Sequence, residues 1–160
     1  MRIVVFSDSH GSFDALYRAL ESQPHADMFL HLGDGYSELE DLCAVFPDKR
    51  ILSVRGNCDF SCLAKSEDIL TAAGKRIFFT HGHLYDVKRG TQRLIRRAKE
   101  LSCDIALFGH THIPVNAHED GVHLRNPGSI GEPRGRQPSY AVIDLSPQGV
   151  EINILPLEKG

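Results

Sequence analysis

Two histidines, His110 and His112, stand one residue apart at the end of an apolar run, between Gly109 and Pro114. Imidazole is a common ligand of transition metals, so this pair raises the question of a metal site. Residues two apart on an extended segment point to the same side. If the segment is extended, both imidazoles can reach one metal cluster, with one imidazole on each of two ions.

Four other apolar runs end in residues of the same kinds. In open α/β sheets, ligands bind at the carboxyl ends of the strands, and a neighbouring glycine lets the backbone turn sharply. A single such pair is common at turns, but five successive strand ends are much harder to produce by chance. We therefore expect these side chains to converge on one spot. The four runs end in Asp8-Ser9-His10, Gly33-Asp34, Gly56-Asn57 and His81-Gly82-His83.

The donor atoms of this set indicate a site for two divalent ions. It offers carboxylates, an amide oxygen and imidazoles, which are too many ligands for one tetrahedral ion. The set contains no thiolates, which argues against a structural zinc site of the cysteine type. Mixed oxygen and nitrogen ligands suit Mn, Fe, Ni, Co or Zn better than Ca. The seven candidate ligands are Asp8, His10, Asp34, Asn57, His81, His110 and His112.

The segments between these residues predict the elements that position them. Short runs rich in apolar and β-branched residues predict buried strands over 2–8, 27–34, 50–57 and 104–110. Apolar residues at helical spacing predict helices over 12–23, 37–46 and 91–102. Ser12 is the expected cap of the first helix, and Ser37 and Glu40 have capping-box spacing in the second. Paired runs around a glycine predict strand pairs over 67–82, 115–126 and 139–157.

The order of these elements predicts an α/β fold. The β-α-β-α-β opening implies parallel strands joined by helical crossovers, and the later strand pairs imply a mostly antiparallel half. We expect a two-sheet β-sandwich flanked by helices, forming a single domain over 1–160. The length of 160 residues fits one domain, and 41% hydrophobic and 24% charged residues are ordinary globular values.

Composition argues against several classes of partner. A formal net charge of −3 provides no general basic field for nucleic acid or an acidic membrane. No apolar run approaches the roughly 18 residues of a membrane span, and the first run ends at Ser7-Asp8, too early for a secretory signal. The cysteines form no C-x-x-C pair and are expected as free thiols in a reducing compartment. We expect a cytoplasmic protein, with a homo-oligomer left open. These cysteines are Cys43, Cys58, Cys62 and Cys103.

The strand-end motifs together resemble the signature of the calcineurin-like metallophosphoesterase superfamily. The series is D-x-H at 8–10, G-D at 33–34, G-N-x-D at 56–59, H-G-H at 81–83 and G-H-T-H at 109–112. The short chain and N-P-G-S at 126–129 make it similar to the compact YfcE-like phosphodiesterase branch. The resemblance implies an α-β-β-α sandwich with two metal ions, Mn being the expected metal. It implies a hydroxide between the ions that attacks phosphorus in line.

The resemblance also assigns roles to individual residues. It places Asp8, His10, Asp34 and His112 on one ion, and Asp34, Asn57, His81 and His110 on the other. We expect His10, Asp34, Asn57 and His81 to act in catalysis, and Asn57, Cys58 and His83 to contact a small phosphoester substrate. The remaining histidines are expected to be structural or surface residues; they are His25, His31, His118 and His123.

Position 58 departs from the family pattern. Many family phosphatases have a histidine there, which contacts the phosphate and assists the leaving group, whereas this chain has Cys58. The thiol could donate a proton, or it could simply line the site. A site without a strong proton donor favours esters with good leaving groups, so we expect a phosphodiesterase. The alternatives are a phosphomonoesterase or nucleotide pyrophosphohydrolase on the same centre, or a non-catalytic scaffold like the related retromer subunit. The role of Asp59 stays open.

Overall fold

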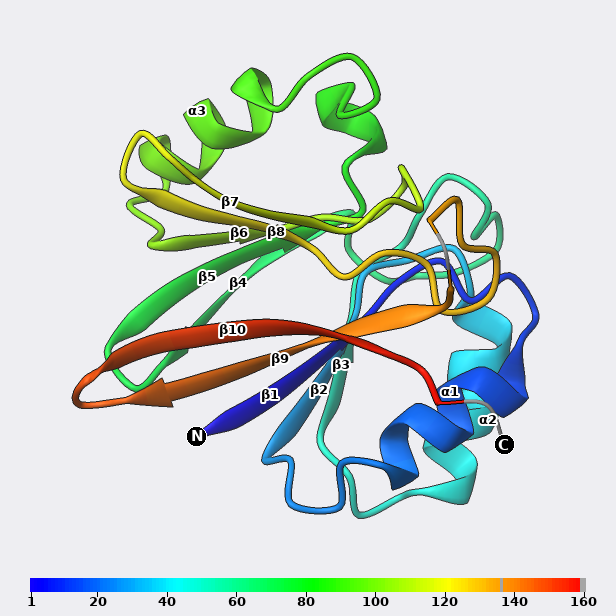
Figure 1. The fold of residues 1–160 in the computed structure, drawn as a ribbon. Coiled ribbons are helices and arrows are strands. Elements are labelled where there is room, and N and C mark those ends of the chain that lie inside the picture. The colour runs from blue at the N-terminus through cyan, green and yellow to red at the C-terminus, as the bar shows by residue number, and fades with distance from the viewer. Residues whose placement is uncertain (136, 159–160) are drawn as a thin grey trace.

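The computed structural model describes residues 1–135 and 137–158, and in this part of the chain ten strands form two five-stranded sheets (Figure 1). The first sheet has the order β10-β9-β1-β2-β3. Its parallel part is β1 (Arg2–Phe6), β2 (Met28–His31) and β3 (Ile51–Ser53). The antiparallel pair β9 (Ser139–Ser146) and β10 (Gly149–Pro156) joins it at β1. The last predicted strand pair therefore extends the sheet that the first strand begins.

The second sheet has the order β4-β5-β6-β8-β7. The hairpin of β4 (Glu67–Ala72) and β5 (Lys75–Thr80) lies at one side, and that of β7 (Val115–Glu119) and β8 (Val122–Asn126) at the other. Between them, β6 (Ile105–Leu107) runs parallel to both β5 and β8. A short 3-10 helix, η1 (His83–Tyr85), follows β5.

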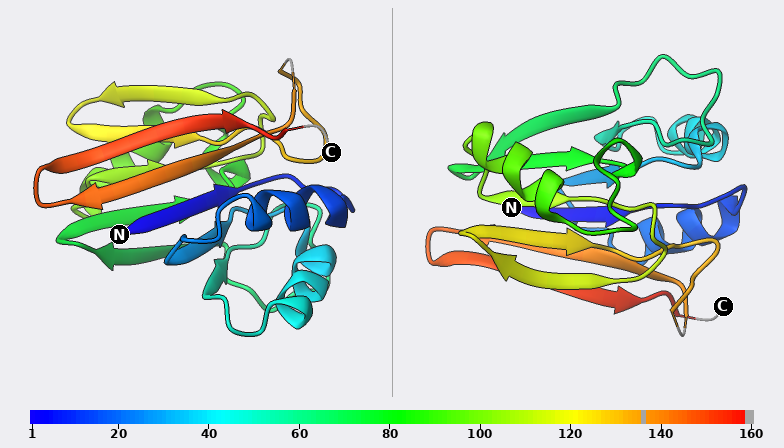
Figure 2. Two further views of the ribbon diagram at one scale, coloured as in Figure 1. Left: turned by 60° about the horizontal axis from the view of Figure 1, so that its bottom comes forward. Right: turned by 90° about the horizontal axis from the view of Figure 1, so that it is seen from above.

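Helices cover the outer faces of both sheets, as Figures 1 and 2 show. The helices α1 (Phe13–Glu21) and α2 (Tyr36–Val45) pack on the first sheet, and α3 (Gln92–Glu100) packs on the second. The strand alternation places Ile3 and Val5 in the core between the sheets, while Val4 and Phe6 pack against the helices. A strand buried on both faces explains the unbroken apolar run at the start of the chain. The predicted two-sheet sandwich flanked by helices is confirmed.

Element boundaries differ from the prediction in an informative way. The predicted strands include the candidate ligands, but β1 ends at Phe6, β2 at His31 and β6 at Leu107. The strands stop because the following residues leave the extended backbone, as described below. No helix in the described residues is both long and apolar enough to cross a membrane.

Of the predicted helix caps, Ser12 does occupy the N-cap position of α1, whereas the capping box of Ser37 and Glu40 is wrong. Ser12 precedes α1 but makes no side-chain capping bond. Ser37 lies inside α2 rather than before it, because that helix already begins at Tyr36. The cap of α2 comes instead from a residue distant in sequence, Asp59, which accepts the backbone N–H of Tyr36.

Candidate metal centre

The loops that carry the candidate ligands leave β1, β2, β3, β5 and β6 at one end of the sandwich, on the right in Figure 1. Both sheets therefore contribute to the site. Asp8, Asp34 and Asn57 come from the first sheet, while the histidines at 81, 110 and 112 come from the second. The expected convergence of five strand ends is present in the fold.

Left-handed backbone conformations concentrate in these loops. A positive φ is uncommon for a residue other than glycine and requires support from the surrounding structure. The extended-segment argument for His110 and His112 is therefore wrong in its geometry, although both imidazoles do reach the centre. The left-handed candidate ligands are Asp8 (φ 55°), His10 (φ 44°), Asp34 (φ 58°), His110 (φ 67°) and His112 (φ 58°).

One group of donor atoms is formed by Asp8, His10 and His112, all within 4.8 Å of one another. The Nε2 atom of His112 lies 3.2 Å from Oδ1 of Asp8 and 3.1 Å from Nε2 of His10. Donor atoms that share one divalent ion at about 2.1 Å lie about 3 Å apart, so this spacing is the one a metal requires.

A second group is formed by Asp34, His81 and His110. The Nε2 atom of His81 is its centre: it lies 3.3 Å from Oδ2 of Asp34 and 3.2 Å from Nδ1 of His110. The amide oxygen Oδ1 of Asn57 is 3.1 Å from the same nitrogen. His10 lies between the groups, since its Nε2 is 3.9 Å from both Asp8 Oδ1 and Asp34 Oδ2.

Hydrogen bonds on the far side of two imidazoles turn their lone pairs inward. Nδ1 of His81 donates to the carbonyl of Leu32 at 2.8 Å, and Nδ1 of His112 donates to that of Glu132 at 2.6 Å. In a neutral imidazole, the other nitrogen is then an acceptor. Backbone carbonyls commonly orient metal-binding histidines in this way. Neither carbonyl partner has a side-chain signature, so sequence reasoning missed both.

The carboxylate of Asp8 points an unsatisfied oxygen at this space. Its Oδ2 accepts hydrogen bonds from the Ser7 hydroxyl and from the backbone N–H of His110. Its Oδ1 is buried and has no hydrogen-bond partner among the described residues. Within the same part of the chain, no lysine or arginine pairs with Asp8 or Asp34, which are 0% and 3% exposed. Buried carboxylates without a cationic partner, surrounded by lone pairs, fit divalent cations.

The burial and close spacing of these carboxylates and imidazoles set their pKa values. Burial raises the pKa of Asp8, but in the absence of a metal the neighbouring imidazoles of His112 and His81, when protonated, outweigh it, so the pKa lies below its usual value. Burial likewise opposes ionisation of Asp34, but a protonated His81 beside it sets its pKa well below the ordinary range. Although burial opposes it, Asp34 and Asp8 in turn raise the pKa of His81, so without a metal a proton is held where a cation would bind. Burial and the charge of His81 lower the pKa of His110 to about 4. Two ionised carboxylates and a neutral imidazole are the protonation states that bind metals.

Asp59, whose role the sequence left open, ties the ligand loops together. Its Oδ2 accepts the backbone N–H groups of Asp34 (2.8 Å) and Gly56 (2.7 Å), and its Oδ1 those of Gly35 (2.9 Å) and Tyr36 (3.0 Å). One carboxylate thereby caps α2 and fixes the loops that carry Asp34 and Asn57. Of these four hydrogen bonds, only the one from Gly56, three residues before Asp59, is local in sequence. The sequence therefore could not assign this role to Asp59.

A second buried network holds the loop of Asp8 and His10. The backbone N–H of Gly33 donates to Nδ1 of His31, so Nε2 of His31 carries the proton and donates to Ser9 Oγ at 3.1 Å. Ser9 in turn donates to Oε1 of Glu38 at 2.7 Å. Glu38 also accepts the backbone N–H of Gly11. This arrangement gives His31 the structural role expected of it.

Close backbone approach explains two of the glycines. A Cβ at Gly56 would lie 2.0 Å from Oδ1 of Asp34, and one at Gly109 would lie 1.9 Å from the hydroxyl of Ser7. Any side chain at either position would displace groups that hold the carboxylates. These two glycines thus allow the backbone to approach the side chains of Asp34 and Ser7 closely, as the sequence predicted for glycines beside the ligands.

The predicted substrate-contacting residues lie around the two groups. Cys58 donates its backbone N–H to Oδ1 of Asp34, and its sulfur lies within 4.8 Å of donor atoms of Asp34 and His10. Burial, then the charge of Asp34, raises the pKa of this thiol, which therefore stays protonated at neutral pH. The ring of His83 is 5.4 Å from that of His81 and 6.2 Å from that of His110, outside both groups.

Comparison with known proteins identifies the family. The model of the calcineurin-like phosphoesterase superfamily domain matches residues 1–148. The chain belongs to this superfamily. Its members are metal-dependent phosphoester hydrolases, so the candidate metal centre has the chemistry that the family requires, and the enzyme class expected from the sequence is confirmed.

Individual relatives agree with this assignment. The probable metallophosphoesterase YsnB of Bacillus subtilis is 39% identical over 147 residues, covering 91% of this chain and 85% of YsnB. The phosphodiesterase YfcE of Escherichia coli is 32% identical over 171 residues, covering 90% and 88%. A predicted phosphoesterase from Streptococcus pneumoniae has a crystal structure with a TM-score of 0.84 and 32% identity, covering 97% and 88%. A zinc complex of Vps29 from Entamoeba histolytica has a TM-score of 0.77 at 17% identity, covering 99% and 100%, and shares the fold.

Proposed function

We propose that this phosphoesterase is a phosphodiesterase with a dinuclear centre. The observation that carries the proposal is the pair of donor groups on either side of His10, one built on Asp8 and the other on Asp34. One ion would be held by Asp8, His10, Asp34 and His112, and the other by Asp34, Asn57, His81 and His110. Because both sheets supply ligands, the whole chain acts as one catalytic domain.

Two divalent ions in this centre would supply Lewis acidity, which withdraws charge from the phosphoryl oxygens and makes water acidic enough to attack phosphorus. The protein's part is to hold and orient. Asp34 bridges the two groups through Oδ2, and His10 and His81 line the space where the phosphoryl group sits. Asn57, Cys58 and His83 contact the ester. Mn is the metal we propose, because oxygen and nitrogen ligands suit it and the nearby Cys58 stays a protonated thiol rather than a competing thiolate.

Cys58 carries the preference for diesters. Its protonated thiol is a weak acid in its surroundings, so it gives little help to a poor leaving group. The relatives YsnB and YfcE, named as a metallophosphoesterase and a phosphodiesterase, are consistent with this choice. The four free cysteines suit a reducing compartment, and we propose the cytoplasm as the site of action.

Hydrolysis of bis(4-nitrophenyl) phosphate with Mn²⁺ tests the function, with 4-nitrophenyl phosphate as the matched monoester. We expect turnover of the diester to exceed that of the monoester, to disappear on chelation and to return with Mn²⁺. Far faster hydrolysis of the monoester would assign the centre to a phosphomonoesterase. Absence of turnover with Mn, Ni, Co, Fe and Zn alike would favour the scaffold function, against which the complete ligand set argues.

A further inference from the structure

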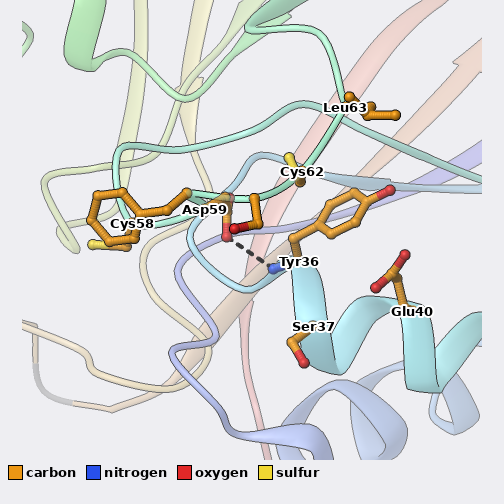
Figure 3. A pocket seen from close by; sticks show the side chains of 9 residues that line it. Tyr36, Ser37, Glu40, Cys58, Asp59, Cys62 and Leu63 are labelled. Carbon is orange, nitrogen blue, oxygen red and sulfur yellow. Dashed lines mark hydrogen bonds between the residues drawn. The ribbon is translucent and has the colours of Figure 1, made fainter.

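A hollow of about 410 Å³ opens between the first turn of α2 and the loop over residues 58–63 (Figure 3). Sites for small molecules have volumes from about 300 Å³ upward, so the hollow is large enough to hold a substituent of a substrate. In Figure 3, Tyr36 and Glu40 extend from α2 toward the loop that carries Cys62 and Leu63. The mechanism proposed above makes no use of this space.

Cys58 connects the hollow to the metal centre. It lines the hollow, and its sulfur lies within 4.8 Å of donor atoms of His10 and Asp34. A phosphoryl group placed between the two donor groups therefore has one of its ester arms beside the entrance. Cys58 is thus the residue that the hollow shares with the surroundings of the donor groups.

Its lining presents large apolar side chains to solvent. Phe60 is 88% exposed and Leu63 is 102% exposed, and both lie on the loop that forms one wall. Tyr36 supplies a second aromatic ring from the opposite wall. Covering apolar surface with a ligand is favourable by about 25 cal/mol of free energy per Å² removed from water. Flat apolar groups would be held best, since aromatic rings add stacking to this burial.

The charge of the lining restricts what can enter. It contains no lysine, arginine or histidine, and its charged residues are Glu40 and Asp59. Asp59 already accepts four backbone N–H groups. Glu40 is exposed, and it makes no hydrogen bond or ion pair with any residue that the structure describes. The Glu40 carboxylate would repel a second phosphate or a carboxylate on the substrate. No positively charged side chain in the lining would offset this repulsion.

We propose that this hollow is the specificity pocket for one arm of the phosphodiester, and that it accepts a flat apolar arm that is neutral or positively charged. Arms that carry a second anion are excluded, so nucleotide pyrophosphates are poor substrates. The proposal rests on the proposed phosphodiesterase function, because it concerns which diester that activity selects.

Two symmetric diesters test the charge requirement. Bis(4-nitrophenyl) phosphate and its bis(3-carboxy-4-nitrophenyl) analogue have leaving groups of closely similar acidity, and each places the same arm in the pocket in either orientation. We expect kcat/KM to favour the neutral diester by about tenfold, as a modest like-charge repulsion would produce. Glu40→Lys should abolish this preference. Asp41→Lys is the matched control, since Asp41 is the next exposed residue of α2 and makes the same change in net charge outside the pocket.

The apolar requirement is tested by Phe60→Ala. This variant should lose about fivefold in kcat/KM on the neutral diester, the size of one aromatic contact. It should weaken the binding of diphenylphosphinate, measured by calorimetry, by a similar factor. Val45→Ala removes an apolar side chain that is 52% exposed at the far end of α2 and should change neither quantity. Metal content should remain that of the wild type in all four variants.

The outcomes separate the two proposals. Turnover of both diesters with the same preference in Glu40→Lys and Asp41→Lys would overturn the pocket and leave the phosphodiesterase standing. Unchanged diphenylphosphinate binding in Phe60→Ala would do the same. Absence of turnover by the wild-type enzyme with every metal would overturn the proposed function and the pocket's role with it.

Discussion

The two ends of the sandwich both contain left-handed residues, but they hold them for different reasons (Figure 1). At the hairpin end, Ala73-Gly74 and Asp120-Gly121 form two-residue turns in which both residues have positive φ. Turns of this kind are the usual connection between antiparallel strands, because their twist matches that of the strands. The strain there is local and a short stretch of sequence explains it.

At the ligand end, the left-handed residues are tied to other loops. Asp8 donates its backbone N–H to the carbonyl of Gly33, and His10 donates to that of Asp34. His110 donates its backbone N–H to Oδ2 of Asp8, in a loop of the other sheet. Each unusual conformation is thus supported by a segment distant in sequence. At the hairpin end, positive φ is therefore set by the two residues of a turn. At the ligand end, it is set by contacts between loops that are distant in sequence, as is common at functional sites.

The sharpest contrast between the ends comes from one substitution made at both. Asp34→Asn removes the charge of the carboxylate that faces both donor groups, whereas Asp120→Asn changes an exposed turn residue that tolerates asparagine. We expect the first to lower diesterase kcat/KM by more than the roughly 10–100-fold typical of a lost orienting contact. Its metal content, measured by elemental analysis, should also fall. Asp120→Asn should match the wild type in both measurements, and equal metal content in the two variants would refute the assignment of Asp34.

Asp59→Asn tests whether the ligand end depends on contacts between loops. An amide presents an NH₂ group to two of the four backbone donors that the carboxylate now satisfies. We expect a loss of about 10–100-fold in metal affinity or activity, and a decrease of about 1–3 kcal/mol in the free energy of unfolding.

Asp41→Asn, on the exposed face of α2, is the control for this change. Denaturant titration of the metal-free variants measures stability, and Mn²⁺ titration measures affinity. Wild-type Mn²⁺ affinity in Asp59→Asn would show that the loops hold their geometry without this carboxylate.

This contrast also explains how much could be predicted from sequence. The strands, the helices and the seven candidate ligands follow from periodicity and from the repeated placement of polar residues after apolar runs. Those signals are local. The positive φ values at Asp8, Asp34 and His110, and the cap of α2 by Asp59, depend on segments that meet only in the folded chain. Ser37 and Glu40 have capping-box spacing, yet the distant carboxylate occupies the position that such a cap would take.

The buried network beneath the ligand end predicts a pH dependence. Burial lowers the pKa of His31 to about 4, while an unfolded histidine titrates near 6.5. Between these values the unfolded chain binds a proton that the folded chain does not, so stability is fully present above pH 6.5 and is lost as pH falls toward 4. The loss is at most about 3–4 kcal/mol, because each pKa unit corresponds to about 1.36 kcal/mol.

Urea titrations of the metal-free protein and of His31→Gln at several pH values isolate this contribution. The difference in unfolding free energy between the two proteins should shrink as pH falls from 6.5 to 4. At the hairpin end, the exposed Arg2–Asp144 pair lowers the pKa of Asp144, so it should stabilise the fold by no more than about 1 kcal/mol, a contribution that is present above the usual carboxylate pKa and is lost only as pH falls below it. A difference that stays constant between pH 6.5 and 4 would contradict a neutral, buried His31.

The smallest effect is expected where the strain is local. Ala73 occupies the first position of its turn with φ 47°, and it is exposed. Alanine is a poor residue there, while the equivalent turn has Asp120, and Asn-Gly is the favoured pair for this geometry. Ala73→Asn should therefore raise the free energy of unfolding by about 0.5–1 kcal/mol. Thermal denaturation of the metal-free protein measures this gain, and Mn²⁺ affinity should not change, because the turn lies at the end of the sandwich opposite the donor groups. Destabilisation by Ala73→Asn would mean that this turn is also held by contacts beyond its own residues, and the distinction between the two ends would fail.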